Sequence, residues 1–225
     1  MAREKIKVKA VLFDLDGTLI DSIDAYLGIV NTVFGRLGLA LPEREEVLKV
    51  MQYIKNPWES LVPHDRDDRE QIIEECRKID KEVVQQVFGR QLKLIDGSLG
   101  VLKNLKSRGF PVGIVTASWG TFSVGFLKRH GLSEYIDVII THREVPVKKP
   151  APDGILECLR QLGCQPAEAV YVGDSPVDVM AGKAAGTFTV GVLTGTSKRE
   201  ILADLGPDMV VNDVGELAEV IELLD

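Results

Sequence analysis

The sequence predicts an α/β fold, in which a doubly wound parallel sheet with a Rossmann-like core carries an inserted α-helical domain. Short runs of residues that are apolar throughout recur along the chain, and helical patterns lie between most of them. The stretch 19–95 breaks this alternation, because it contains helical patterns and no strand signal. Polar side chains also follow several of the apolar runs, as at the ligand-binding edge of such a sheet.

The expected strands are apolar along their whole length, which is typical of strands that are buried on both faces of a sheet. They cover residues 10–13, 112–115, 137–140, 169–172, 188–192 and, with a weaker signal, 209–211. Each helical pattern between them closes on a glycine, which is the residue that most often follows a helix end. These glycines are Gly109, Gly131, Gly163 and Gly186.

The inserted stretch contains two amphipathic helical patterns. The first follows Ser22, an expected N-cap, and the second ends before Gly89. Residues 19–95 are therefore expected to form a helical cap domain, and residues 1–18 and 96–225 the α/β core. Trp58 in the insert is expected to pack inside it, although an aromatic residue in such a loop could also contact a ligand.

The composition limits the choice of partners. Lys and Arg number 27 and Asp and Glu 34, for a net charge of −7, which argues against nucleic acid as a partner. An anionic substrate would therefore need local positive charge or a metal ion. The three cysteines have no metal-site spacing, and no apolar run near the start is long enough for a signal peptide or a membrane span. We expect a cytoplasmic protein without a membrane partner, and nothing in the sequence indicates its oligomeric state.

Polar residues follow four of the predicted strands. Because ligands bind outside the carboxyl ends of the strands in an open parallel sheet, we expect these side chains to converge at one edge. A single aspartate after a strand is usually a turn or cap residue, but four such sites in succession are hard to explain in that way. The residues are Asp14 and Asp16, Thr116, Lys149, and Asp174 with Asp178.

Four motifs carry a resemblance to a known family. The segment DLDGT, the strand that ends in Thr116, the lysine in K-P-x-P and the segment GDSPVD resemble the four signatures of the haloacid dehalogenase superfamily of phosphatases. The resemblance covers the whole chain, including a helical cap after the first motif. Within the superfamily the chain is most similar to the phosphoglycolate phosphatase group, which includes pyrophosphatases and is close to β-phosphoglucomutase.

The resemblance implies catalytic roles for the first motif. Asp14 would be the nucleophile and would become an aspartyl-phosphate. Asp16 would protonate the leaving alcohol and then take a proton from the attacking water, and Gly17 would allow the chain reversal that brings Asp16 over the site. Taken alone, Asp16 could also be a cap for the next turn.

The resemblance also implies a phosphate-binding set. Thr116 and Lys149 would bind the phosphate, with Lys148 as the alternative lysine, and Thr116 alone could be an ordinary strand-end threonine. Backbone N–H groups of Leu15, Asp16 and Ala117 could complete the anion site. Family members often carry asparagine where this chain has Ala117, and Ser118 is the candidate to replace that contact.

Charge accounting predicts a metal ion. The four aspartates would carry up to −4 and the phosphate about −2, against +1 from Lys149. Oxygen ligands and a phosphate favour Mg²⁺. The resemblance implies Asp14, Asp174 and the main-chain carbonyl of Asp16 as ligands. Asp178 would orient ligand waters and pair with Lys149, unless it is only a first-turn carboxylate of the next helix.

The expected function is a Mg²⁺-dependent phosphatase for a small phosphorylated metabolite, with 2-phosphoglycolate as the first choice. A pyrophosphatase or nucleotidase and a β-phosphoglucomutase-like phosphomutase remain open, as does a catalytically silent binding module. A haloacid dehalogenase is disfavoured, because carbon–halogen cleavage has no leaving alcohol for Asp16 to protonate.

Overall fold

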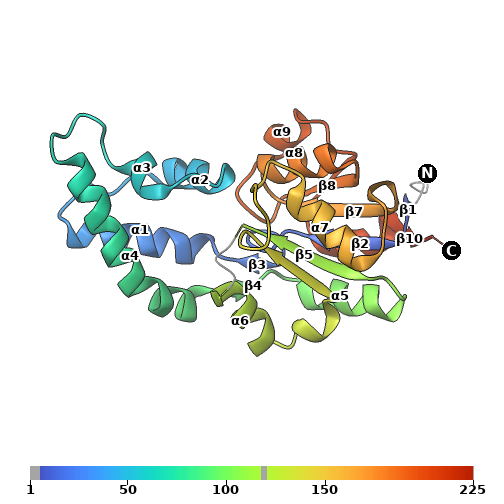
Figure 1. Cartoon of the computed structure of the whole chain (residues 1–225). Coiled ribbons are helices and arrows are strands. Elements are labelled where there is room, and N and C mark those ends of the chain that lie inside the picture. The colour runs from blue at the N-terminus through green and yellow to red at the C-terminus, as the bar shows by residue number, and fades with distance from the viewer. Residues whose placement is uncertain (1–5, 118–120, 225) are drawn as a thin grey trace. The chain divides into compact units, whose positions relative to one another are not determined.

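Six parallel strands form the central sheet, in the order β6-β5-β2-β7-β8-β9 (Figure 1). This arrangement confirms the predicted doubly wound parallel sheet. In the computed structural model, which describes residues 6–117 and 121–224, the strands are β2 (Ala10–Phe13), β5 (Val112–Thr116), β6 (Val138–Thr141), β7 (Ala169–Gly173), β8 (Phe188–Val192) and β9 (Met209–Val211).

The strand order reverses beside β2. From β2 the chain builds β5 and β6 toward one edge, and it then returns to add β7, β8 and β9 on the other side. Phe13 at the end of β2 is in register with Ile114 of β5 and with Val172 of β7. The carboxyl ends of β2 and β7 therefore lie at the topological switch point, where open α/β sheets bind their ligands.

Helices cover both faces of this sheet, with α7 and α8 on one face and α5 on the other (Figure 1). Helix α7 packs closely on β5, since a Cβ atom added at Gly154 would lie 2.8 Å from Cγ1 of Val115. The helices are α5 (Ser98–Ser107), α6 (Thr121–Arg129), α7 (Asp153–Leu162), α8 (Pro176–Ala185), α9 (Arg199–Ala203) and α10 (Leu217–Val220), with 3₁₀ turns at Ser133–Tyr135, Pro166–Glu168 and Val214–Glu216.

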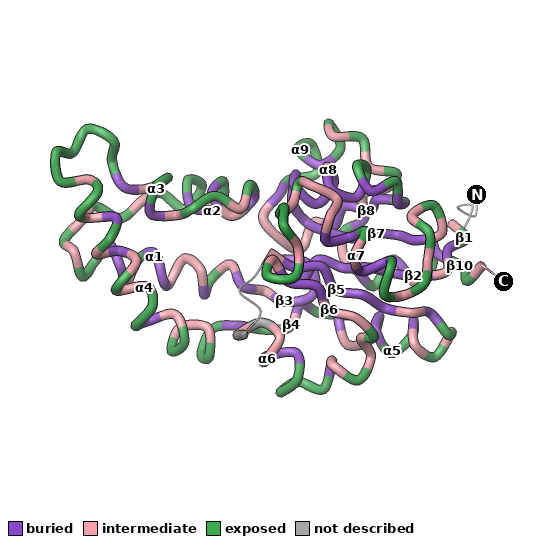
Figure 2. Tube along the Cα trace, in the orientation of Figure 1, coloured by how far each residue is buried: buried purple, intermediate pink, exposed green. Residues whose placement is uncertain are grey.

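The sheet is the buried centre of its unit, as Figure 2 shows for the strands. All residues of β2, β5 and β7 are buried. Tyr171, Leu12, Ile155 and Cys158 belong to one core cluster between the sheet and its helices. This packing explains why the apolar runs predicted these strands correctly, apart from small differences at their ends.

Four short strands were not predicted. Strand β1 (Ile6–Val8) pairs in parallel with β10 (Ile221–Leu223), and β3 (Ile20–Asp21) pairs with β4 (Lys93–Leu94). Each has two or three residues, and its partner is distant in the sequence. Such segments are too short to show a period, so only the pairing defines them as strands.

The chain divides into two compact units, one of Met1–Asp21 with Leu94–Asp225 and the other of Ser22–Lys93. The second unit is helical, and its helices are α1 (Ile23–Arg36), α2 (Arg44–Gln52), α3 (Pro57–Leu61) and α4 (Arg69–Gln91). Among the described residues, no helix is long and apolar enough to cross a membrane.

Three details of the helical unit bear on its predicted features. Ser22 occupies the N-cap position of α1, but its side chain makes no capping hydrogen bond. The prediction that the second helix ends before Gly89 was wrong, because α4 continues through this glycine to Gln91. Trp58 is 3% exposed and packs within the unit, with its ring centroid 6.4 Å from that of Phe34.

Candidate active site

A buried lysine joins two of the predicted aspartates at the carboxyl edge of the sheet. The Nζ atom of Lys149 donates to Oδ1 of Asp14 at 2.5 Å and to Oδ1 of Asp178 at 2.6 Å. The three side chains are between 2% and 8% exposed. They come from segments after β2, β6 and β7, so the fold brings together residues that are far apart in the sequence.

The same lysine has two further partners on the adjacent strands. Its Nζ atom lies 3.1 Å from the hydroxyl of Tyr171 and 3.3 Å from the carbonyl oxygen of Val115. The Tyr171 hydroxyl donates to Oδ1 of Asp178 at 2.8 Å. The backbone N–H and the hydroxyl of Ser175 donate to the other oxygen of Asp178. Asp178 is therefore held by Ser175 at the start of its own helix and by the ammonium group of Lys149.

The structure distinguishes the two neighbouring lysines, Lys148 and Lys149, by their positions. Lys149 enters the carboxylate cluster, whereas Lys148 is exposed. The sequence analysis did not identify Tyr171, which lies inside strand β7. The one sign of its role was a polar hydroxyl in a segment that is otherwise typical of a fully buried strand. A buried tyrosine hydroxyl normally needs a hydrogen-bond partner, and here Asp178 and Lys149 supply it.

Asp174 is held by a loop that the sequence analysis did not single out as functional. The backbone N–H and the hydroxyl of Thr196 donate to Oδ2 of Asp174 at 2.8 and 3.0 Å. The hydroxyl of Thr18 lies 3.4 Å from Oδ1 of Asp174. A Cβ atom at Gly17 would lie 2.6 Å from this carboxylate, and one at Gly195 would also collide with it. Both glycines are needed because the backbone approaches the carboxylate closely.

The turn after β2 has the reversal that was predicted around Gly17. This residue has φ +87°, a left-handed conformation that favours glycine. Its N–H donates to the carbonyl of Ile20 at 2.7 Å, and its own carbonyl accepts a hydrogen bond from the Thr194 hydroxyl at 2.7 Å. Asp16 lies in this turn and is partly exposed, unlike the buried Asp14.

Burial and nearby negative charge together shift the pKa values of Asp14 and Asp174. Burial raises the pKa of Asp14 well above its usual value; Lys149 opposes the rise, while Asp178, Asp174 and Asp16 add to it. Burial, together with Asp178, raises the pKa of Asp174 to about 7. Burial lowers the pKa of Lys149, but the charges of Asp14 and Asp178 outweigh it and leave that pKa well above its usual value.

These carboxylates have the chemistry of a divalent metal site. One oxygen from each of Asp14, Asp174 and Asp178 lies within 4.8 Å of the other two, and all three residues are buried. Oxygen donors with excess negative charge suit a hard divalent cation, which would offset charge that Lys149 alone does not balance. The residues present therefore fit a divalent metal ion.

The remaining predicted residues follow β2 or lie at the end of the neighbouring strand β5. Thr116 is the last residue of β5 and is 3% exposed, opposite Thr141 at the end of β6. Ala117 follows it, and Leu15 is fully buried beside Asp14. Ser118 lies outside the described residues, so its predicted contact stays a prediction.

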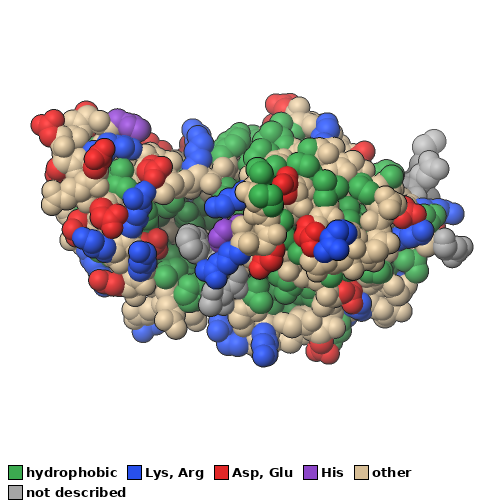
Figure 3. Space-filling view, in the orientation of Figure 1, with side chains coloured by type: hydrophobic (Ala, Val, Ile, Leu, Met, Phe, Trp, Pro, Cys, Tyr) green, Lys and Arg blue, Asp and Glu red, His purple; other side chains and the backbone are tan. Residues whose placement is uncertain are grey.

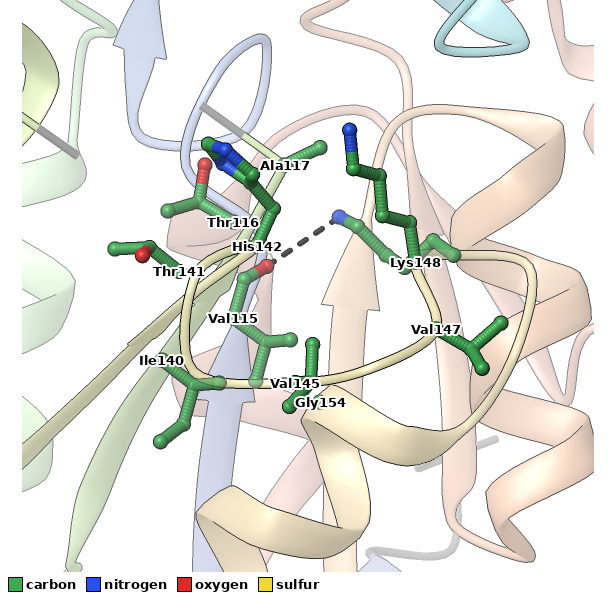
Figure 4. Close-up of a pocket in the computed structure, with 11 residues that line it drawn as sticks. Val115, Thr116, Ala117, Ile140, Thr141, His142, Val145, Val147, Lys148 and Gly154 are labelled. Atoms are coloured by element: carbon green, nitrogen blue, oxygen red, sulfur yellow. Dashed lines mark hydrogen bonds between the residues drawn. The ribbon is translucent and has the colours of Figure 1, made fainter. Parts of the chain in front are cut away.

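A hollow opens beside the lysine at this edge of the sheet (Figure 4). Its walls come from β5, β6, the loop after β6 and the start of α7. The lining residues are Val115, Thr116, Ala117, Ile140, Thr141, His142, Val145, Val147, Lys148, Lys149 and Gly154.

Comparison with known families agrees with this arrangement. The profile of the family described as haloacid dehalogenase-like hydrolase matches residues 11–192, which include most of β2, all of β7, and every aspartate and lysine of the site. The chain belongs to this family. It is therefore a haloacid dehalogenase-like hydrolase, as the four sequence motifs indicated.

Relatives of this hydrolase have phosphatase names. It is 31% identical to the pyrophosphatase PpaX of Bacillus velezensis, across 95% of this chain and 96% of that one. It is also 31% identical to the phosphoglycolate phosphatase of Yersinia pestis, across 96% and 94% of the two chains. The crystal structure of CbbY from Rhodobacter sphaeroides in complex with phosphate superposes with a TM-score of 0.76 at 25% identity, covering 95% of this chain and 99% of CbbY.

Proposed function

We propose that this hydrolase is a Mg²⁺-dependent phosphatase that acts on a small phosphorylated metabolite through an aspartyl-phosphate, with 2-phosphoglycolate as the first candidate. The observation that carries the proposal is the buried cluster of Asp14, Lys149 and Asp174 at the switch point of the sheet. Retention of the whole set argues against the alternative of a catalytically silent binding module.

The first chemical step uses the two aspartates of the first motif. An oxygen of Asp14 attacks phosphorus, and the bond from phosphorus to the leaving oxygen breaks. Asp16, which is partly exposed in the turn after β2, gives its proton to the leaving oxygen. In the second step water attacks phosphorus, its proton goes to Asp16, and phosphate leaves as the Asp14 carboxylate is restored.

Lys149 and the strand ends bind the phosphoryl group in this proposal. The ammonium group at 2.5 Å from Asp14 orients the nucleophile and offsets negative charge beside it. The hydroxyl of Thr116 and the backbone N–H groups of Leu15, Asp16 and Ala117 are the proposed hydrogen-bond donors to the phosphoryl oxygens.

Asp14, Asp174 and the main-chain carbonyl of Asp16 are the proposed Mg²⁺ ligands, and Asp178 is the residue that supports the ligand shell. When bound, the ion would neutralise phosphate charge and polarise the phosphoryl oxygens. Asp174 is pre-oriented for this role by the two hydrogen bonds from Thr196.

Pyrophosphate is the second candidate substrate, because the pyrophosphatase PpaX of B. velezensis is as similar in sequence as the phosphoglycolate phosphatase of Y. pestis. The CbbY structure, which superposes on this chain, is a complex with phosphate, which supports phosphate as a ligand of this fold. A nucleotidase or a phosphomutase uses the same residues and would be distinguished by substrate preference or a bisphosphate requirement.

Other expectations also remain proposals. The helical unit, predicted as residues 19–95, is the proposed cap that selects substrates. The three cysteines form no disulfide, which supports a reducing, cytoplasmic location. Basic and acidic side chains alternate over the face in Figure 3, which supports a small-molecule substrate over nucleic acid.

A screen of phosphorylated metabolites with and without Mg²⁺ would test the function, with kcat/KM as the measure. Asp14→Asn is expected to lower kcat by at least about 10⁴-fold, because the nucleophile is lost. Its circular dichroism should match that of the unaltered protein, which separates chemistry from folding. Activity without a divalent cation, or substantial turnover by Asp14→Asn, would contradict the proposal.

A further inference from the structure

The hollow beside the candidate active site has an unusual charge. Two lysines and one histidine line it, and among the described residues no carboxylate does. The chain as a whole has more acidic than basic residues, with a net charge of −7. A lysine of this hollow whose charge the protein does not offset would attract an anionic group.

The two lysines of this hollow have different surroundings. Lys149 is matched by the carboxylates of Asp14 and Asp178. Lys148 is exposed, and within the described part of the chain its ammonium group makes no ion pair. The charge of Lys148 is therefore available to a ligand, whereas the charge of Lys149 is largely offset by the protein.

The position of Lys148 limits what it can bind. Consecutive Cα atoms are about 3.8 Å apart, so Lys148 starts next to the residue that is proposed to hold the phosphoryl group. Figure 4 shows its side chain rising to the same end of the hollow as Ala117 and His142. This end adjoins Thr116 and Ala117, which are proposed to face the phosphate.

We propose that Lys148 binds a second anionic group on the leaving part of the substrate. The preferred substrates would be phosphates whose leaving group carries a carboxylate or another phosphate. This inference rests on the proposed phosphatase function and adds a specificity-determining residue to it.

Three substrates and three substitutions test the inference. 2-Phosphoglycolate and pyrophosphate carry a second anion, whereas 2-hydroxyethyl phosphate replaces the carboxylate by a neutral group. Lys148→Gln is expected to lower kcat/KM about tenfold for the first two and less than twofold for the third. Lys148→Arg should restore the preference because it keeps the charge. Arg143→Gln is the matched control, since Arg143 is an exposed cation of the same loop that does not line the hollow.

The outcomes separate this inference from the proposed function. An equal fall with all three substrates would overturn it, because Lys148 would then act on the transferred phosphoryl group or on the fold. Unchanged kcat/KM values for all three substrates would overturn it as well.

If the unaltered protein with Mg²⁺ hydrolyses 2-hydroxyethyl phosphate, the phosphatase function holds whatever Lys148→Gln shows. If it hydrolyses none of the three, 2-phosphoglycolate and pyrophosphate are both excluded as substrates and the inference falls with them. A loss with only pyrophosphate, or only 2-phosphoglycolate, supports it and identifies the second anion.

Discussion

Replacing Lys149 by methionine should destabilise the sheet unit strongly. The ammonium group lies 2.5 Å from Asp14 and 2.6 Å from Asp178, which at an effective dielectric constant near 20 corresponds to about 6 kcal/mol of attraction per pair. Desolvation of the buried ions cancels several kcal/mol of this gain. Methionine keeps the approximate length but leaves the carboxylates without their cation, so the expected loss is about 3–5 kcal/mol. Protonation of one carboxylate would limit the loss, because burial already raises the pKa of Asp14.

Urea unfolding followed by circular dichroism is the assay. With a slope of up to about 3 kcal/mol per molar urea, the midpoint for Lys149→Met should fall by about 1–2 M. Lys148→Met is the matched control, because it removes the same charge from an exposed neighbour and should change stability by no more than about 0.5 kcal/mol. Adding Mg²⁺ should raise the midpoint of Lys149→Met more than that of the unaltered protein, since the ion would replace the missing charge. Equal midpoints for Lys149→Met and Lys148→Met would refute the reasoning.

Three further substitutions probe individual contacts. Asp16→Ala should slow turnover by about 10²–10⁴-fold and let the phosphoenzyme accumulate, as measured by quench-flow with labelled substrate; a normal rate would remove its acid–base role. Thr196→Val should weaken Mg²⁺ binding about tenfold, measured by calorimetry, because Asp174 loses a hydroxyl donor at 3.0 Å; Thr196→Ser should recover it, and unchanged affinity in Thr196→Val would refute this role. Tyr171→Phe should lower the free energy of unfolding in urea by about 1–3 kcal/mol, because a buried hydroxyl that donates to Asp178 at 2.8 Å is lost. An unchanged free energy of unfolding would mean that this hydrogen bond does not contribute to stability.

The central sheet could be predicted because its strands are buried on both faces. Such strands are apolar at every position, and β2 and β7 show this without a gap. Convergence of the site could also be predicted, since parallel strands bring their carboxyl ends to one edge. By contrast, β1 and β10 have three residues each and pair across nearly the whole chain, so no local pattern indicates them.

The partners of the site residues were harder to predict than the residues themselves. Asp174 follows a strand and stands out in the sequence, but Thr196 comes from a loop that lies 22 residues away. Tyr171 resembles an ordinary core residue in the sequence, because it lies between Val170 and Val172 inside a fully buried strand. Its hydroxyl reaches Asp178 only because α8 begins directly after the strand and returns over it. Such contacts depend on three-dimensional packing, and residue type alone does not reveal them.

The structure also locates the negative charge that the sequence predicted only as a total. Lys149 balances Asp14 and Asp178, whereas among the described residues no cation lies within ion-pair distance of Asp174. Asp174 receives neutral donors instead, from Thr196 and Thr18. Hydrogen bonds orient a carboxylate but do not cancel its charge, and burial with Asp178 nearby raises its pKa to about 7. The charge that Lys149 does not pair with therefore lies on Asp174, where a divalent cation held by this carboxylate would offset it.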